Sequence, residues 1–361
     1  MRFVQIPKIN DAWDNVSITL LSPSTFSRVE KGCAFSVLLQ KALETFNDKS
    51  LLLPASKSAV LGTIVHKIYE LSSKQILNTF ADLSAKWDLL IKQIENEMKT
   101  AYPTLNNVNL NDYDKRNKCF RNVFKHIVNR SSNRTATESN VKMFTEYRID
   151  CSEIGLRGVI DKLCISNGNV EITDYKSGSV LDDNGNIKDD YLMQMNLYAI
   201  MCEHKGLGTS FTTSLIDFDG TRFDVDYNPN CKNDYLTRVH NVIVSLNDIV
   251  RNRTFDNAIK TDVDSCSLCA VRHICEKQKY SGETQFATII GFVTQIISAN
   301  LYELEMSWGG KVYISGLERY SIEDDYYLNK KLSFVNLIWS ESDSSSKCYR
   351  VTDNTIIYEL Q

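Results

Sequence analysis

The sequence predicts an α/β fold in which helices flank a mixed sheet, followed by a small all-β module. Three observations support this prediction. Apolar residues follow helical spacing up to about residue 130, strands and two helices follow between about 142 and 252, and short strands alone follow about residue 282. We therefore expect two domains, 1–282 and 283–361.

The composition is that of a globular protein with packed cores, since 43% of the 361 residues are hydrophobic and 24% are charged. No run approaches 18 consecutive apolar residues, and the N-terminus lacks the charged-then-apolar order of a secretory signal. We expect a cytoplasmic protein without membrane contact. The formal net charge of −4 gives no overall attraction to nucleic acid, although a local basic groove would not show in that sum.

The N-terminal part is expected to be helical. Ser22-Pro23 is a favourable helix start, because the hydroxyl can cap free N–H groups and proline fits the first turn. Further helices are expected at about 59–71 and 80–99, the second with an apolar stripe typical of a core. Between about 111 and 130, basic residues share one helix face. A solvated surface is the default interpretation of that face, and contact with phosphates is the alternative.

Segments rich in β-branched and aromatic residues predict strands from about 142 to 176 and at about 210–227, with helices at about 188–204 and 232–252. After about residue 282, short strands divided by turns are typical of an OB-like or SH3-like barrel. Its aromatic residues would fill a core or stack unpaired bases. Acidic neighbours disfavour phosphate contact, so we expect this module to bind a helicase or another protein partner.

The most informative segment is a hairpin around Asn167-Gly168. Both residues accept the positive φ angles of a two-residue type I′ turn, so the residues that flank them pair. Counting back along both strands places Asp161 directly opposite Asp174, with Cβ atoms roughly 4.5–5.5 Å apart. Like charges in that position are destabilising unless something compensates them. A divalent cation would do so.

Strand alternation sends Asp174 and Lys176 to the same face. Carboxylate oxygens suit Mg²⁺ or Mn²⁺, which can polarise a phosphate and lower the pKa of a bound water. A neighbouring ammonium would orient that water or steady the developing charge. Taken alone, these residues also fit an exposed hairpin with ordinary surface charges.

Two weaker signals lie on expected helices. Gly62 precedes His66 by one turn on the same face, and a glycine there would permit close approach of another element. Gln194 and Tyr198, spaced i, i+4, also share a helix face. By itself, a lone helical histidine is more often a packed or surface residue than a ligand, and the Gln-Tyr pair says little.

Together these segments resemble the RecB-like branch of the PD-(D/E)XK nuclease superfamily. The resemblance covers about residues 20–280 and implies a restriction-endonuclease-like mixed sheet flanked by helices, with the active site at the hairpin. Its motifs occur in order, and they are Ser22-Pro-Ser-Thr-Phe-Ser with Cys33, Gly62-Thr-Ile-Val-His66, Gly158-Val-Ile-Asp161, Asp174-Tyr-Lys176-Ser-Gly and Gln194-x-x-x-Tyr198.

The resemblance also implies roles for individual residues. Lys176 would be the catalytic lysine, and Gln194 and Tyr198 would organise the lysine and the DNA strand. Glu146, in the strand before the hairpin, falls where the family often has a supporting acid. The implied metal ligands are His66, Asp161, Asp174 and the backbone carbonyl of Tyr175.

The cysteines give a second signal. Ten cysteines in a chain without an export signal indicate reduced thiols or a metal site. Cys266, Cys269 and Cys275 have a spacing suited to Zn²⁺ or an Fe–S cluster, and His273 is one candidate for the fourth ligand. The resemblance to AddB-type and CRISPR-adaptation nucleases implies Cys33 instead, around a structural [4Fe–4S] cluster that pins the N-terminal helix to the end of the nuclease domain.

We therefore expect a deoxyribonuclease that uses Mg²⁺ or Mn²⁺, an exonuclease acting on single-stranded or unwound DNA in repair, recombination or defence. A non-catalytic nucleic-acid-binding subunit is the alternative, and the presence of every acidic and lysine position argues against it. An Fe–S redox protein would need a second cofactor motif, which the sequence lacks. It also lacks a G-x-x-x-x-G-K-[ST] phosphate loop, so any unwinding would come from a partner.

Overall fold

The computed structural model describes residues 3–361 apart from 75, 78, 106–108, 111–112, 114, 133–140, 218, 263–264, 267–268, 279–286, 321–325 and 341–346. The helices are α1 (Pro23–Lys31), α2 (Ala34–Glu44), α3 (Lys57–Ser73), α4 (Phe80–Ala101), α5 (Arg116–Ser132), α6 (Asp189–His204) and α7 (Lys232–Asn252). The strands of the five-stranded sheet are β2 (Lys142–Cys151), β3 (Leu156–Ser166), β4 (Asn169–Tyr175), β5 (Ser210–Ile216) and β6 (Arg222–Val225). The remaining strands are β1 (Val4–Ile6), β7 (Ala287–Ser298), β8 (Leu301–Met306), β9 (Lys311–Ser315), β10 (Lys331–Ser340), β11 (Lys347–Arg350) and β12 (Ile356–Leu360).

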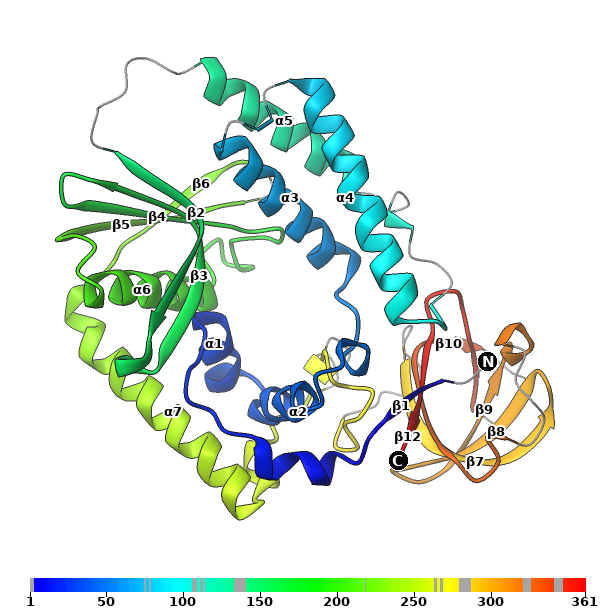
Figure 1. The fold of residues 1–361 in the computed structure, drawn as a ribbon. Helices are drawn as coiled ribbons and strands as arrows, with labels where there is room; N and C mark the ends of the chain where they lie inside the picture. Colours follow the sequence, from blue (N-terminus) through cyan, green and yellow to red (C-terminus); the bar gives the residue numbers. More distant parts are fainter. Residues whose placement is uncertain are drawn as a thin grey trace.

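The expected mixed sheet flanked by helices is confirmed. Its strand order is β2-β3-β4-β5-β6, with β4 and β5 parallel and the other pairs antiparallel. The α6 helix makes the crossover from β4 to β5 and is buried along most of its length. Such a crossover is what a parallel strand pair requires, because a tight turn cannot join parallel neighbours. Figure 1 shows this sheet at the opposite end of the molecule from the C-terminal strands.

The predicted hairpin forms as β3 and β4. Asn167 and Gly168 have φ angles of 48° and 81°, as a type I′ turn requires, and the residues flanking them pair. The helix start predicted at Ser22 also forms, because its hydroxyl accepts a hydrogen bond from the Thr25 N–H at 3.1 Å and Pro23 begins α1. Local sequence signals therefore determine these two elements.

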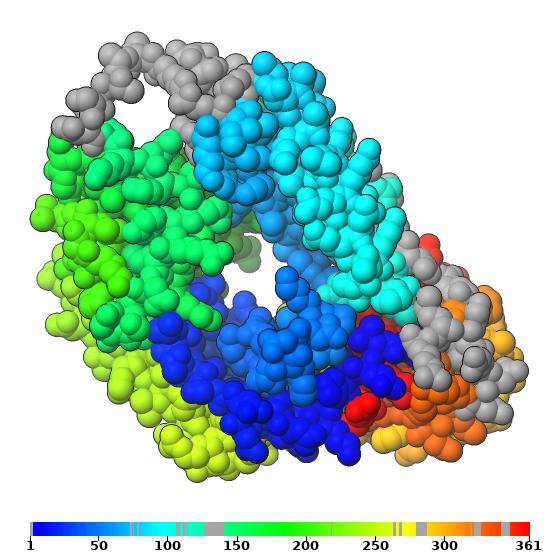
Figure 2. All heavy atoms as spheres, in the orientation of Figure 1, coloured from blue at the N-terminus to red at the C-terminus, as the bar shows by residue number. Residues whose placement is uncertain are grey.

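The α3, α4 and α5 helices form a layer with its own hydrophobic core, in which Trp87 and Ile68 are fully buried. The α1, α2, α6 and α7 helices share a larger core with the five-stranded sheet. Figure 2 shows an opening in the molecular surface between these two groups, bordered by the sheet in green and by the blue residues of the α1–α3 region. Within the described residues, no helix is both long enough and apolar enough to cross a bilayer.

The C-terminal module is a barrel. Its strands follow one another in the order β7-β8-β9-β11-β10, and β10 closes the ring by pairing with β7. The β9–β11 pair is parallel and the other pairs of the ring are antiparallel. A five-stranded Greek-key ring is the arrangement of OB-folds, so the structure supports the OB-like alternative over the SH3-like one.

The beginning of the chain joins this barrel, which the sequence analysis did not anticipate. β1 pairs in parallel with β12, and the Phe3 ring stacks on Tyr327 with 4.5 Å between centroids. Toward the five-stranded sheet and its helices, the Ile357 N–H donates to Thr104 Oγ1 at 3.2 Å, and Tyr358 belongs to the larger core. A boundary at residue 282 remains a prediction, and the start of the chain contributes to both sides, since Phe3 belongs to the barrel core and Ile6 to the larger core.

Gly291 allows β7 and β8 to approach each other inside the barrel. A Cβ added there would lie 2.4 Å from the Glu305 carbonyl oxygen, too close for two backbones held by a ladder. We expect Gly291→Ala to destabilise the protein by about 1–3 kcal/mol and to lower its thermal midpoint. A matched control is Gly178→Ala, because nothing lies within 4 Å of a Cβ added at Gly178. Equal midpoints for the two variants in thermal denaturation would contradict this account of the barrel.

Candidate active site

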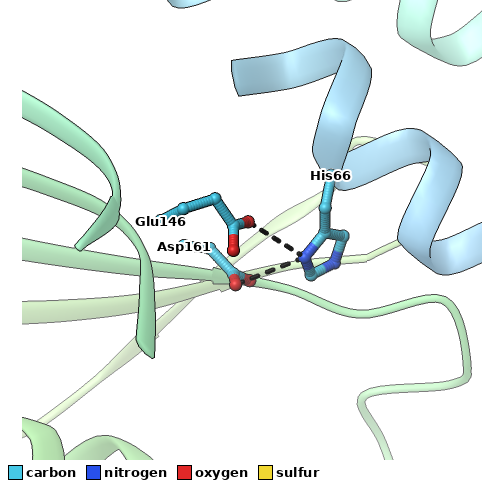
Figure 3. Close-up of side chains that lie close together, drawn as sticks. All are labelled: His66, Glu146 and Asp161. Atoms are coloured by element: carbon cyan, nitrogen blue, oxygen red, sulfur yellow. Dashed lines mark ion pairs between the residues drawn. The ribbon is translucent and has the colours of Figure 1, made fainter. Parts of the chain in front are cut away.

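Three side chains from three different elements meet where α3 faces the five-stranded sheet. His66 projects from α3, Glu146 from β2 and Asp161 from β3 (Figure 3). The His66 Nδ1 atom lies 3.3 Å from Asp161 Oδ1 and 3.8 Å from Glu146 Oε1. One ligand atom from each residue falls within 4.8 Å of the other two, a separation that suits joint coordination of one cation.

The position of Glu146 depends on an unusual backbone conformation. The pairs Thr145–Lys162 and Tyr147–Ile160 flank Glu146 and place it across from Asp161 on the neighbouring strand. Glu146 has a φ of 50°, in the left-handed region that a residue with a Cβ seldom adopts. Strained conformations of this kind cluster at functional sites. Sequence analysis gave Glu146 only a supporting role, whereas the structure places it beside His66.

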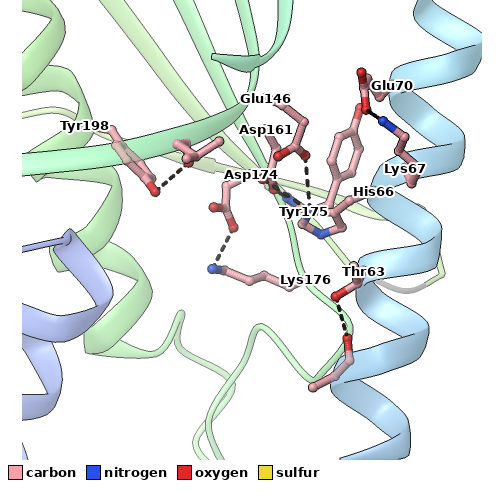
Figure 4. A network of polar contacts seen from close by, with 12 residues as sticks. Thr63, His66, Lys67, Glu70, Glu146, Asp161, Asp174, Tyr175, Lys176 and Tyr198 are labelled. Carbon is pink, nitrogen blue, oxygen red and sulfur yellow. Dashed lines mark hydrogen bonds and ion pairs between the residues drawn. The ribbon is translucent and has the colours of Figure 1, made fainter. Parts of the chain in front are cut away.

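A second network lies beside this cluster. Lys176 Nζ is 2.6 Å from Asp174 Oδ2 and donates a hydrogen bond to Gln194 Oε1, also at 2.6 Å. The Gln194 Nε2 amide in turn donates to Asp174 Oδ1 at 2.9 Å, which closes a triangle of polar contacts. The side chains of Asp174 and Lys176 are 6% and 14% exposed. Lys176 comes one residue after β4, and its side chain lies beside that of Asp174, as Figure 4 shows.

Asp161 connects the two groups. The predicted register of the β3–β4 hairpin holds up to the pair Lys162–Thr173, the last pair of the ladder, one step before Asp161 and Asp174. At that step Asp161 Oδ2 accepts a hydrogen bond of 2.7 Å from the Tyr175 N–H. The two strands are therefore joined beyond the ladder by a side chain rather than by the direct opposition that the sequence analysis expected.

Ring contacts and a close approach hold α3 against β4. The Tyr175 ring stacks on Tyr69 with 4.5 Å between centroids and lies edge-on to His66 at 5.9 Å. One turn before His66, a Cβ added at Gly62 would lie 3.3 Å from Ser177 Oγ. The close approach expected at Gly62 is thus confirmed, and it brings the histidine to the strand ends.

Tyr198, on α6, contacts the backbone of β3. Its hydroxyl donates to the Val159 carbonyl oxygen at 2.8 Å, and its ring fits where Gly158 lacks a side chain, since an added Cβ there would lie 2.8 Å from the ring. Tyr198 is 5% exposed. The sequence analysis expected this residue to organise the DNA strand, but the structure uses its hydroxyl to fix the backbone two residues before Asp161.

Burial and the charge of Asp161 both disfavour the ionised forms of the neighbouring carboxylates. Burial, together with the charge of Asp161, raises the pKa of Asp174 above its ordinary value, and the ammonium of Lys176 opposes that rise. Burial and the same Asp161 charge also raise the pKa of Glu146. The ionised forms of Glu146 and Asp174 are therefore both disfavoured next to Asp161. Such a site is suited to bind a divalent cation, which would stabilise all three charges.

The four predicted cysteines line one cavity of about 400 Å³. Cys33 stands at the N-terminus of α2, and Cys266, Cys269 and Cys275 come from the segment after α7. Burial raises the pKa of the Cys275 thiol to about 12. Among the described residues that line this cavity, the charged ones are all cations, Arg28, Lys260 and Arg272.

His273, the alternative fourth ligand, is used elsewhere. Its Nε2 atom lies 2.8 Å from the Leu51 carbonyl oxygen, and its ring lies over Tyr358 with 4.7 Å between centroids. Burial lowers the pKa of His273 to about 3. Cys33 is among the described residues that line the cavity, and His273 is not.

Comparison with known proteins agrees with this geometry. The family model of the PD-(D/E)XK nuclease superfamily matches residues 20–276. No protein with a curated description matches the sequence. Among solved structures, one similar chain is a protein from Eubacterium rectale provisionally described as an exonuclease. The alignment has 14% identity and a TM-score of 0.37, and it covers 76% of this chain and 96% of that chain.

The pKa of His66 tests the geometry of this site directly. Burial alone would lower this pKa, but the hydrogen bond and charge of Asp161 outweigh burial and raise it. Asp161→Asn should therefore lower the pKa of His66 in metal-free protein, as followed by NMR titration of the imidazole protons in EDTA. As a control, Glu153→Gln removes the carboxylate beside His204 and should leave His66 unchanged. An unaltered His66 titration in Asp161→Asn would contradict the contact.

Proposed function

The chain belongs to the PD-(D/E)XK nuclease superfamily, and from this premise we propose that it is a deoxyribonuclease dependent on Mg²⁺ or Mn²⁺. The observation that carries the proposal is the meeting of His66, Glu146 and Asp161, next to a buried pair of Asp174 and Lys176. A binding subunit that kept the fold but had no catalytic activity would not need these side chains to contact one another. Their mutual contacts therefore favour an enzyme over a non-catalytic binding subunit.

The proposed ligand set uses side chains from both networks. His66, Glu146 and Asp161 would bind the ion directly. Asp174 and the backbone carbonyl of Tyr175 would lie next to it as further candidate ligands. A bound divalent ion would polarise the phosphate and lower the pKa of a water molecule. Lys176, held by Asp174 and Gln194, would stabilise the negative charge that develops on the phosphate during hydrolysis.

The finer proposal is exonuclease action on single-stranded or unwound DNA. The opening in Figure 2 supports it, because protein borders that opening on every side of the view. A strand that passes through such an opening needs a free end and an unpaired backbone. Use in repair, recombination or defence stays a prediction from the resemblance.

The cysteine cavity supports a [4Fe–4S] cluster as a structural group. All four cysteines line this cavity, and a volume of about 400 Å³ exceeds what a single tetrahedral zinc ion requires. Four thiolates would make the bound group anionic, which suits a lining with Arg28, Lys260 and Arg272. Such a group would join α2 to the segment after α7, as a cross-link between distant parts of the chain.

The barrel is proposed to bind a protein partner such as a helicase. On its outer face the Glu303 carboxylate accepts hydrogen bonds from Thr294 at 2.8 Å, Lys311 at 2.7 Å and Tyr313 at 3.0 Å. A carboxylate therefore already neutralises the basic group that a phosphate would need. This arrangement favours a protein surface over a nucleic-acid strand.

The activity is tested with single-stranded linear, single-stranded circular and duplex DNA in Mg²⁺, Mn²⁺ or EDTA. We expect metal-dependent cleavage of the linear single strand, none in EDTA and little on the circle, because a circle has no end to enter the opening. Cleavage of circles at the linear rate would contradict the exonuclease proposal. Absence of cleavage in every metal would contradict the nuclease proposal.

Substitutions at the second network separate chemistry from folding. Asp174→Asn and Lys176→Ala should each lower the cleavage rate at least about 100-fold, because each removes a charge beside the reacting phosphate. Matched controls are the exposed Asp183→Asn, in the turn before α6, and Lys92→Ala on α4. Thermal midpoints and rates are measured for all four variants. A Lys176→Ala variant that cleaves at the control rate would show that the active site lies elsewhere.

The cluster is tested by metal content. Protein purified without oxygen should be brown with about four irons per chain, and Cys33→Ser should lose iron and thermal stability because one of four ligands is gone. Cys231→Ser is the control, since Cys231 lies outside the cavity. Colourless protein with one zinc per chain would support the zinc alternative. Iron retained in Cys33→Ser would contradict the assignment of the fourth ligand.

A further inference from the structure

The ring of Tyr191 has two lysine ammonium groups as neighbours, one of them that of the catalytic candidate Lys176. Lys176 Nζ lies 4.5 Å from the ring centroid, and Lys188 Nζ lies 5.9 Å from the same centroid. Tyr191 belongs to the first turn of α6, one turn before Gln194. No sequence motif singled it out, yet it is the aromatic neighbour shared by both lysines.

Tyr191 completes the surroundings of the Lys176 ammonium. Two of that group's neighbours are oxygen atoms of Asp174 and Gln194, both at 2.6 Å. The ring provides a third neighbour, to which the cation is attracted by the negative face of the π system. A ring also excludes water from that side, so the flexible four-carbon chain of the lysine is limited to one orientation.

Lys188 has a different environment. It is half-buried, and among the residues that the structure describes no carboxylate forms an ion pair with it. The adjacent acids are engaged elsewhere, because Asp189 and Asp190 lie 3.1 and 3.5 Å from Lys31 Nζ. The Lys188 backbone N–H donates to the Val180 carbonyl oxygen at 3.0 Å, which fixes where its side chain begins. Its ammonium therefore remains available for an anion.

We propose that Tyr191 is a positioning residue that orients Lys176 for catalysis and holds Lys188 against the phosphate next to the scissile one. A DNA strand has phosphates on both sides of each nucleotide, so two ammonium groups on one ring can contact neighbouring phosphates. The three residues together fix the register of the strand in the site. This inference rests on the proposed nuclease function.

The test separates the two lysines by kinetics on a linear single-stranded oligonucleotide at saturating Mn²⁺. Tyr191→Leu removes the ring and should lower kcat about 3- to 30-fold with a small change in KM. Tyr191→Phe keeps the ring and should retain at least about half of the parent kcat. Lys188→Ala should act mainly on KM and raise it several-fold. The slope of log KM against the logarithm of the salt concentration should fall by roughly one, because about one fewer counterion is released on binding.

Controls keep the outcomes distinct. Lys92→Ala on α4 reports the effect of removing an unrelated lysine, and thermal midpoints report folding. Tyr191→Met, similar in volume to leucine but unbranched, replaces Tyr191→Leu if the latter fails to fold. An inactive parent would overturn the proposed function itself. With an active parent, the inference is overturned if Tyr191→Leu and Tyr191→Met match the parent, if Tyr191→Phe is impaired as much as they are, or if Lys188→Ala leaves KM and its salt dependence unchanged.

Discussion

The structure depends on three carboxylates that β2, β3 and β4 hold close together, Glu146 and Asp161 from the middle of their strands and Asp174 from near the end of β4. Burial, and then the charge of Asp161, raise the pKa of both Glu146 and Asp174, so the proximity of these groups must be imposed by the rest of the fold. His66 from α3 and Lys176 beyond β4 supply the compensating groups. The layer of α3, α4 and α5 and the buried helix α6 pack against the sheet in positions that bring these compensating groups to the carboxylates. Nucleases need such a concentration of negative charge to hold a cation at a phosphate that would otherwise be repelled.

Sequence reasoning succeeded where the signal was local. The Asn167-Gly168 turn and strand alternation were enough to bring Asp174 and Lys176 to one face. Glu146 was underrated, because its position follows from the β2–β3 register and from a left-handed residue, and neither has a local signature. The register itself could have been obtained by pairing 142–151 with 156–165 across their short connection. The parallel pairing of β1 with β12 joins opposite ends of the chain and leaves no local trace in the sequence.

The segment from Cys266 to Cys275 links three parts of the molecule. It lines the thiol cavity together with the start of α2, and Arg272 within it donates hydrogen bonds of 2.9 Å to both the Cys269 carbonyl and Asn336 Oδ1 of the barrel. His273 contacts Leu51 and Tyr358 from the same segment. A group bound by the cysteines would therefore stabilise the N-terminal helices, the end of the nuclease domain and the barrel at once.

The most direct test of this account is the location of the catalytic ion. Crystals of the protein soaked with Mn²⁺ and measured at a wavelength where manganese scatters anomalously would give its position independently of any assay. The account predicts an anomalous peak bounded by His66, Glu146 and Asp161, with Asp174 beside it. A peak at another site, or none at a concentration of Mn²⁺ that supports cleavage, would contradict it.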